Sequence, residues 1–428
     1  MKLASWILTL TLWLLAVCSI PANAEANGTG GINAPDQQDK PYLILISIDG
    51  FRRDYQDLYD TPALDRIADS GVRADALIPV FPTLTFPNHY SIATGLYPAN
   101  HGLVGNRFPS KDRSRFYSLR DRETVEDGSW YRGEPIWVAA EKSGMVSAAF
   151  FFVGTEADIG GVRMSYWNTF DASVSGKRRV DQVLDWLAMP DDKRPHLITL
   201  YFEHVDTATH RSGPGSKRSI SSIKRVDGYL GRLLAGIDRL PIADDAYIVV
   251  VSDHGQTTII DNAKPFIINS VVSVDGITIV NHGSVAFLYL PEPDQQRSEA
   301  IRTAINNAWD HGRAMLQNET PDSWNVTSDA GFADIIVQAD PGYAVYSSGD
   351  PSSHAGWSIG DHGWAPEFEE MHGIFLARGQ RLPRGKRIAA INAVDVYPLM
   401  MEILEIPVTT PIDGDPDKLV RLLTPQPE

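Results

Sequence analysis

Apolar residues dominate three short runs along the chain, and polar residues follow each run. The runs are Leu43–Ile48, Leu197–Phe202 and Tyr247–Val251. Five of the six residues from Leu43 to Ile48 are aliphatic, and no helical spacing of polar positions interrupts them. Such runs predict strands that are buried on both faces, as in the centre of a parallel sheet.

Segments with helical spacing lie between these runs. From Ile220 the apolar positions recur at the spacing of an amphipathic helix that ends near Ile237. Thr61-Pro62 is a suitable start for a short helix that stops at Gly71. Further strands are expected at 72–80, Ala148–Val153 and 371–377, and further helices at Val180–Leu187 and Asp395–Leu404. This alternation predicts an α/β fold with a mostly parallel central sheet flanked by helices on both faces.

Two stretches depart from the alternation. Residues 105–135 are polar and mixed in composition, which predicts a long surface loop. Between 266 and 345, two strand-like runs near 267–280 and 285–290 precede a helix near 297–310. We interpret this second stretch as a small α+β subdomain, inserted into one domain that spans 41–428.

The N-terminal residues have the pattern of a secretory signal peptide, residues 1–24. Lys2 provides the positive start, Trp6–Val17 is apolar, and Ala22-Asn23-Ala24 is a small-residue cleavage site. We expect cleavage after Ala24 and export to the periplasm or the medium. A lipoprotein signal that uses Cys18 is the alternative, although Val17 is unsuitable before a lipidated cysteine. Residues 25–40 are polar and predict a flexible segment, and no later stretch predicts a membrane span.

The formal charge and the cysteine content limit the chemistry. A net charge of −16 repels nucleic-acid backbones, so we expect no nucleic-acid binding, and an anionic substrate would need a local positive charge such as a metal. Cys18 is the one cysteine of the 428 residues. Any metal ligands of the mature protein are therefore expected to be histidine, carboxylate or hydroxyl groups.

Acidic and histidine side chains follow several of the predicted strands. Active sites of open α/β sheets lie beyond the carboxyl ends of strands. Taken singly, each such residue could be a turn residue or a core histidine, but together they favour a catalytic site for Zn²⁺ or Mn²⁺. The candidates are Asp49, Asp206, His210, Asp253, His254 and His362.

A hydroxyl group completes the candidate chemistry. Thr85 precedes Phe86-Pro87 and a helix-like run that is closed by Gly95, which predicts an N-cap. A helix N-terminus favours a phosphoryl group or an alkoxide. Thr85 could merely cap the helix, or it could be a nucleophile activated by a neighbouring metal.

The stretch Thr85-Phe-Pro-Asn-His-Tyr-Ser-Ile-Ala-Thr-Gly-Leu-Tyr-Pro98 resembles the nucleotide pyrophosphatase/phosphodiesterase family of the alkaline phosphatase superfamily. The resemblance continues in Gly133-Glu-Pro-Ile-Trp137, Lys224-Arg-Val-Asp-Gly228, Ser252-Asp-His-Gly255 and Asp361-His-Gly363. It runs from about residue 41 to 405. Because animal relatives carry disulfides and additional domains, the resemblance implies a bacterial member that consists of the catalytic domain.

The resemblance also implies roles for individual residues. Thr85 would be the nucleophile, and two zinc ions would be held by Asp206, His210 and His362 and by Asp49, Asp253 and His254, with the Thr85 oxygen also bound at the second ion. His354 is an alternative ligand to His362. Asn106, with backbone N–H groups near Phe86, would bind a non-bridging phosphate oxygen. The nucleobase would be clamped by Phe86, Leu119 and Phe170.

The implied reaction is hydrolysis of phosphodiester or pyrophosphate bonds of small nucleotides to nucleoside 5′-monophosphates, through a phospho-threonine intermediate. One alternative is a phosphate monoesterase or a phosphonate or sulfate ester hydrolase, because Arg52, Arg53, Arg115 or Arg120 could lie near the site. A silent binding protein for nucleotides or metal is the other. The sequence predicts neither the natural substrate nor the oligomeric state.

Overall fold

A central sheet of eight strands organises the computed structural model, which describes residues 28, 30–260, 264–327, 331–348 and 358–424. The strand order is β19-β2-β18-β9-β1-β8-β6-β7. Neighbouring strands are parallel except at β18, which is antiparallel to both of its neighbours, so the prediction of a mostly parallel sheet is confirmed. The strands are β1 (Tyr42–Ile48), β2 (Val72–Ala74), β6 (Ser147–Phe150), β7 (Tyr166–Trp167), β8 (Leu197–Phe202), β9 (Ala246–Val251), β18 (Phe375–Arg378) and β19 (Lys386–Ile388).

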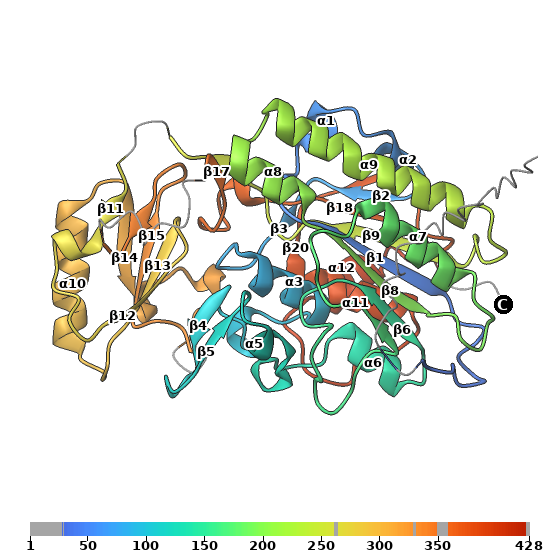
Figure 1. Ribbon diagram of the computed structural model, residues 1–428, viewed down its shortest axis with the longest axis horizontal. Helices are drawn as coiled ribbons and strands as arrows, with labels where there is room; N and C mark the ends of the chain where they lie inside the picture. The colour runs from blue at the N-terminus through green and yellow to red at the C-terminus, as the bar shows by residue number, and fades with distance from the viewer. Residues whose placement is uncertain (1–27, 29, 261–263, 328–330, 349–357, 425–428) are drawn as a thin grey trace, which may run out of the picture.

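Both faces of this sheet are covered by helices, as expected (Figure 1). Every residue of β1 is buried. Leu43 and Leu45 belong to the hydrophobic core on one face, while Ile44 and Ile46 belong to the core on the other face. This two-sided burial explains why the β1 sequence shows no alternation of polar positions. The helices are α2 (Pro62–Asp69), α7 (Gly176–Leu187) and α9 (Lys217–Ile237) on the Ile44 face, and α3 (Thr85–Thr94), α6 (Ile136–Lys142) and α11 (Val396–Ile403) on the Leu43 face.

The parallel strands bring their carboxyl ends to one edge of the sheet. Ile48 of β1 is paired with Phe202 of β8, and Ser47 is paired with Val251 of β9. The residues that follow these three strands therefore meet, and helix α8 (His204–Ser212) begins at this edge.

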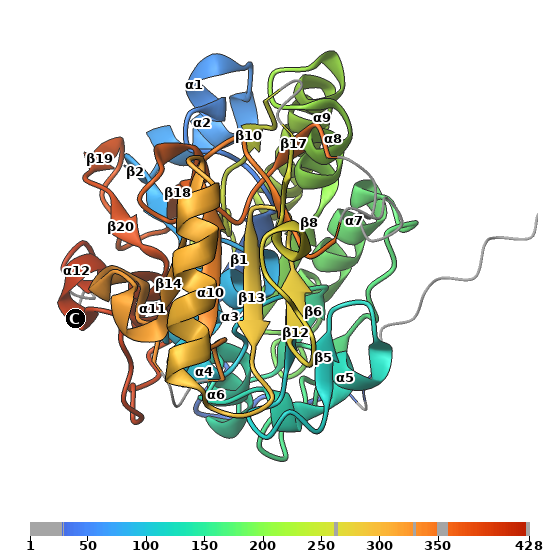
Figure 2. The same cartoon turned by 90° about the vertical axis from the view of Figure 1, so that its left-hand side faces the viewer.

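The segment that was expected to be an inserted subdomain forms a second sheet, β12-β13-β15-β14, which is antiparallel throughout. Helix α10 (Gln295–Ala308) covers one face of it (Figure 2). The opposite face contacts the main core, where Phe81 stacks on Trp324 at 3.9 Å between ring centroids. Two short strands close the base of the segment, because β11 (Phe266–Ile267) pairs with β16 (Val345–Tyr346). The strands of the second sheet are β12 (Thr278–Asn281), β13 (Val285–Tyr289), β14 (Gly312–Leu316) and β15 (Ile335–Ala339).

The expectation of a surface loop over residues 105–135 is wrong. This stretch contains the hairpin of β4 (Arg107–Pro109) and β5 (Phe116–Ser118), followed by α5 (Arg122–Glu126) and the 3₁₀ helix η1 (Gly128–Trp130). Four of its five aromatic residues are buried: the rings of Phe108 and Tyr117 lie 5.1 Å apart, and both contact Trp130. Aromatic residues that are widely spaced among polar ones therefore hold this segment in a folded structure, but they give no periodic hydrophobic pattern in the sequence.

The remaining elements are short. The expected strand over 72–80 is divided into β2 and β3 (Leu77–Ile78), which lie in different sheets. The others are α1 (Tyr55–Leu58), α4 (Pro98–His101), β10 (Thr257–Thr258), η2 (Ile268–Ser270), η3 (Gln317–Glu319), η4 (Asp322–Trp324), β17 (Gly360–Asp361), η7 (Glu369–Met371), β20 (Ile391–Asn392), η8 (Ala393–Asp395) and α12 (Pro416–Val420).

The predicted signal peptide, with Cys18, lies outside the described residues. Part of the segment that was expected to be flexible, 25–40, is held against the domain. The buried Asn33 side chain donates hydrogen bonds to the carbonyl oxygens of Asp191 and Arg194 and accepts one from the Val146 amide. Among the described residues, no helix has the length and apolar character needed to cross a bilayer.

Candidate active site

Two groups of acidic and histidine side chains gather at the carboxyl edge of the main sheet. Within each group, the candidate ligand atoms lie within 4.8 Å of one another. We call Asp206, His210 and His362 the first cluster, and Asp49, Asp253 and His254 the second cluster. All six residues proposed from the sequence are thus brought together as the two expected sets. The alternative ligand His354 lies outside the described residues.

Local structure places each side chain. Asp206 and His210 are one turn apart on α8, and His362 directly follows β17. Asp49 directly follows β1. Strand β9 ends at Val251, so Asp253 and His254 are free of the alternation that would send adjacent strand residues to opposite faces.

Backbone carbonyl groups fix the orientation of two imidazole rings. His362 Nδ1 lies 2.8 Å from the Thr83 carbonyl oxygen, and His254 Nδ1 lies 2.9 Å from the Gly255 carbonyl oxygen. Since a carbonyl only accepts, each Nδ1 must carry the proton, which leaves each Nε2 with a lone pair. His254 Nε2 lies 3.1 Å from Asp253 Oδ2 and 3.4 Å from Asp49 Oδ1, so these three atoms are close enough to bind the same metal ion.

The electrostatics of the site favour bound cations. Burial and the charge of Asp253 raise the pKa of Asp49 well above its usual value. Burial would also raise the pKa of Asp253, but His254 and His89 outweigh it and hold that pKa well below the usual range. Asp49 Oδ1 and Asp253 Oδ2 are buried and have no hydrogen-bond partner in the described part of the chain. Orphaned carboxylate oxygens beside the His254 lone pair fit a divalent metal ion in the second cluster, and the carboxylate and imidazole donors of the first cluster fit another.

Thr85 lies beside the second cluster. Its hydroxyl oxygen is 3.4 Å from His254 Nε2. It is the first residue of α3 rather than the expected N-cap, which is Leu84. The Thr85 carbonyl oxygen lies 2.8 Å from Nδ1 of the buried His89, and Nε2 of the same ring lies 2.7 Å from Ser47 Oγ. This arrangement fixes the start of the helix, whose partial positive charge favours an anion at the hydroxyl group.

Asn106 is held next to Thr85 by the β4–β5 hairpin. Its Oδ1 accepts a hydrogen bond from the Phe86 amide at 2.9 Å, and its backbone carbonyl accepts one from the Leu119 amide at 2.9 Å. The Asn106 side-chain NH₂ group is therefore the one left to donate. The Phe86 N–H is engaged by Asn106, and binding of a phosphate oxygen by other backbone N–H groups near Phe86 stays a prediction.

A cavity of about 450 Å³ opens onto both clusters. Phe86, Leu119 and Phe170 line it together with Thr85 and Asn106, so the structure brings the three expected nucleobase contacts into one space with the hydroxyl group. Phe170 is 41% exposed and meets Phe151 edge-on. An exposed aromatic ring at the rim of a polar cavity is suited to stack on a planar ligand.

The structure also shows site residues that the sequence analysis missed. Tyr201, near the end of β8, donates a hydrogen bond of 2.5 Å to Asp49 Oδ2. Arg122, which lines the same cavity, is paired with the buried Glu156. The signal available for Tyr201 was a polar aromatic residue near the end of a buried strand. The Arg122–Glu156 pair joins segments that are separated in the sequence, so no sequence pattern indicated it.

The arginines expected near the site have different positions. Arg52 is held by two hydrogen bonds to Asp54, of 2.7 and 2.8 Å, and Arg53 is paired with Glu369. Arg115 is paired with Asp127 at 3.0 Å. Arg120 lines the cavity, and its guanidinium group forms no ion pair with the described residues.

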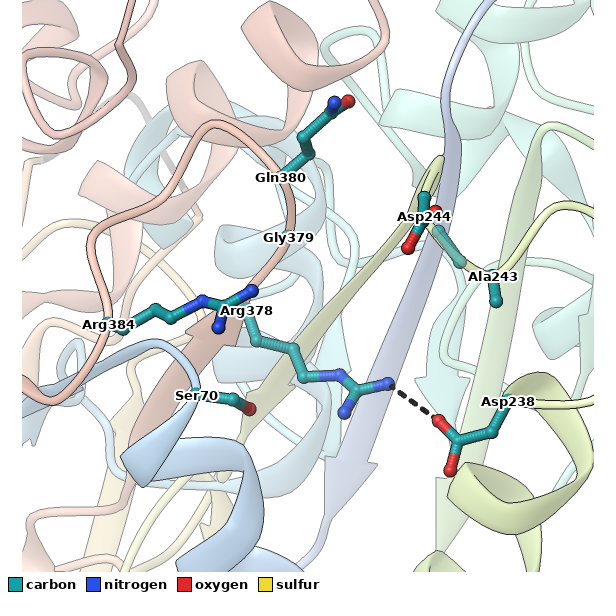
Figure 3. Close-up of a pocket in the computed structure, with 9 residues that line it drawn as sticks. Ser70, Asp238, Ala243, Asp244, Arg378, Gly379, Gln380 and Arg384 are labelled. Atoms are coloured by element: carbon teal, nitrogen blue, oxygen red, sulfur yellow. Dashed lines mark ion pairs between the residues drawn. The ribbon is translucent and has the colours of Figure 1, made fainter.

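A second cavity, of about 530 Å³, lies at the other end of the main sheet (Figure 3). It is lined by Arg378, at the end of β18, and by Asp238, whose carboxylate is 3.9 Å from the Arg378 guanidinium. Since neither cluster borders it, this cavity is separate from the candidate active site.

Comparison with known proteins identifies the family. The model of the type I phosphodiesterase / nucleotide pyrophosphatase family matches residues 43–365. The chain belongs to this family. Human ectonucleotide pyrophosphatase/phosphodiesterase family member 1 is 30% identical over 393 residues, which are 90% of this chain and 42% of the human protein. The Xenopus laevis bis(5′-adenosyl)-triphosphatase enpp4 is 30% identical over 373 residues, 87% of this chain and 79% of the frog protein.

The fold of this phosphodiesterase family member agrees with solved structures. Mouse ectonucleotide pyrophosphatase/phosphodiesterase 5 superposes with a TM-score of 0.82 at 27% identity, over 90% of this chain and all of the mouse chain. An inactive variant of the mouse protein has been solved in complex with AMP. The chain spans about two fifths of the length of the human relative. These relatives are eukaryotic, so the expected bacterial origin stays a prediction.

Proposed function

We propose that this family member is an exported two-zinc phosphodiesterase that hydrolyses phosphodiester or pyrophosphate bonds of nucleotides to nucleoside 5′-monophosphates. The observation that carries the proposal is the Thr85 hydroxyl group, which begins a helix and lies 3.4 Å from the His254 nitrogen of the second cluster. A hydroxyl group becomes a nucleophile when a neighbouring metal stabilises its alkoxide. The His and carboxylate donor set supports zinc.

The chain's own residues would carry out the reaction in two steps. Thr85 Oγ1 loses its proton and attacks phosphorus, and the bond to the leaving oxygen breaks to give phospho-threonine. Water then attacks the same phosphorus, the bond to Thr85 Oγ1 breaks, and the threonine regains its proton. The Asn106 NH₂ group stabilises the charge that develops on a non-bridging oxygen. Two zinc ions, when bound, would act as Lewis acids for the attacking and leaving oxygens.

A nucleotide substrate is supported by the walls of the cavity. Phe86, Leu119 and Phe170 offer apolar surface on which a base can stack, in the same space as Thr85. The AMP complex of the mouse relative supports the same assignment. The expected signal peptide supports export to the periplasm or the medium.

A second candidate, a phosphate monoesterase or a phosphonate or sulfate ester hydrolase, is favoured by Arg120. A monoester carries more negative charge than a diester and needs a guanidinium or ammonium group to bind it. Among the described residues that line the cavity, Arg120 is the arginine without an ion pair, since Arg122 is paired with Glu156. Because Phe86, Leu119 and Phe170 offer apolar surface for a base in the same cavity, we favour the diester.

The test is steady-state hydrolysis of thymidine 5′-monophosphate p-nitrophenyl ester beside p-nitrophenyl phosphate, with zinc-loaded and chelator-treated protein. We expect a strong preference for the diester that is lost with the metal and restored by zinc. A preference for the monoester would support the second candidate. Zinc binding without turnover of either ester would indicate a binding protein instead.

Replacement of Thr85 by alanine tests the nucleophile. We expect Thr85→Ala to abolish turnover of the diester while two zinc ions per chain remain bound, measured by metal analysis of the purified variant. Thr85→Ser is the matched control, since it retains the hydroxyl group and should retain measurable activity. Substantial turnover by Thr85→Ala would exclude the phospho-threonine intermediate.

A further inference from the structure

Gln256 connects the two clusters through one buried side chain. It is fully buried, and its Nε2 lies 2.5 Å from Asp206 Oδ1 of the first cluster. In the chain it stands two residues after His254 of the second cluster. The segment that provides two members of the second cluster therefore also provides a hydrogen-bond donor to the first.

The surroundings of Gln256 fix this contact. A carboxylate only accepts hydrogen bonds, so the amide must turn its NH₂ group towards Asp206. The absence of a side chain at Gly50 leaves room for both partners, because a Cβ atom there would lie 3.2 Å from Gln256 Cδ and 3.0 Å from Asp206 Cα. The Gln256 carbonyl oxygen accepts a hydrogen bond of 3.4 Å from Arg52, which Asp54 holds in turn.

The charge of the site explains why a neutral donor is needed there. Burial and the charges of Asp253 and Asp206 raise the pKa of Asp49, so negative charges are already crowded in this site. Asp206 Oδ1 also lies 3.1 Å from His210 Nε2 and 3.8 Å from His362 Nε2, so the oxygen that Gln256 contacts is the one that faces its own cluster. A donor at this oxygen orients the carboxylate without adding charge.

We propose that Gln256 is a positioning residue that couples the two metal sites. By holding Asp206, it preforms the first cluster, and because it follows His254, ordering of the second cluster by its metal also orders this donor. Binding of one metal ion therefore favours binding of the other. The inference rests on the two-metal site of the proposed function, and it concerns metal affinity rather than the ester that is hydrolysed.

The experiment is a zinc titration against a competing chelator with the full-length protein, its Gln256→Met variant and a matched control, Gln56→Met. Gln56 is also buried, and its Nε2 donates a hydrogen bond of 2.9 Å to Asp65 Oδ1, a carboxylate that belongs to neither cluster. We expect Gln256→Met to bind one of the two zinc ions about 10- to 100-fold more weakly, which is the usual cost of losing a partner of a metal ligand. Gln56→Met should bind both ions as the wild type does.

Two further measurements separate the outcomes. Gln256→Glu has nearly the same shape but offers no NH₂ donor, so it should weaken zinc binding at least as much, even if Gln256→Met fails to fold. Excess zinc should restore the diesterase activity of each Gln256 variant that folds. Equal zinc affinities in the wild type and the Gln256 variants would overturn the coupling alone, whereas a wild type that binds no metal would overturn the proposed function.

Discussion

At the scale of single residues, Asn106 gives a prediction about the transition state. Its Oδ1 is fixed by the Phe86 amide at 2.9 Å, so its NH₂ group has a defined direction. Asn106→Ala should lower kcat for the diester about 10- to 100-fold, because one donor to a developing anion is lost, with a smaller change in KM. Asn100→Ala is the control, since the hydrogen bonds of the Asn100 side chain within the described residues go to the surface residue Asp413. A rise in KM with kcat unchanged would place Asn106 in ground-state binding instead.

The residues of the candidate site differ in how well the sequence could predict them. Asp49 and Asp253 follow strongly apolar strands, so their position at the sheet edge follows from the pattern alone. The division into two clusters came from the family resemblance. The roles of Tyr201 and Gln256 could not be predicted, although Tyr201 stands near the end of a buried strand, because each acts by a hydrogen bond to an aspartate about 50 or more positions away in the chain. Such contacts depend on the rotamer of a single side chain, and the hydrophobic periodicity of the sequence does not indicate it.

At the scale of elements, the β4–β5 hairpin leads to a prediction about substrate binding. Arg113, at its tip, is paired with Asp334 of the inserted segment at 3.0 Å, and Asp334 also accepts a hydrogen bond from the Leu290 amide. The same hairpin holds Asn106 and Leu119. Arg113→Ala should raise KM for the diester by up to about 5-fold, the scale of a partly exposed ion pair, and the difference should shrink at high salt.

The control for this prediction lies on the same hairpin. Arg115 pairs with Asp127 and packs over Trp130, so it makes no contact with the inserted segment among the described residues. Arg115→Ala should therefore leave KM closer to the wild-type value. If both variants raise KM equally, the hairpin itself matters and its attachment to the inserted segment does not.

Elements with long buried apolar patterns could be predicted more accurately than the others. The sequence gives β8 at its observed limits and α9 within three residues, because both have long apolar patterns. The antiparallel direction of β18 could not be predicted, since a buried strand has the same composition in either direction. Strands β14 and β15 were missed as well. They are stabilised by pairing with each other and by the core beneath α10 rather than by a strong local pattern.

At the scale of the whole molecule, buried neutral histidines predict how stability depends on pH. Burial lowers the pKa of His101 to about 3 and that of His282 to about 4. In the unfolded chain both would have a pKa near about 6.5. Because the unfolded state binds these protons first, the stability due to the neutral rings is present above about pH 6.5 and is lost as the pH falls towards 4.

A variant isolates this effect from the loss of metal in acid. The His101 ring bonds Ser91 Oγ and the Leu103 amide, and His101→Gln removes the titrating group. Urea unfolding of both proteins should show a difference in the free energy of unfolding that changes by about 1.4 kcal/mol per pH unit below about pH 6, against the wild type. A difference that is constant with pH would show that folding does not lower the pKa of His101.

The order of the ligands along the chain has a consequence for biosynthesis. Asp49, Asp253 and His254 all precede the inserted segment, whereas His362 follows it. As the chain is made from its N-terminus, the second cluster has all its members once residue 254 has emerged. The first cluster lacks His362 until the inserted segment has been made. The two metal ions therefore have different earliest moments of capture, and the first cluster can be completed only after the inserted segment has been synthesised.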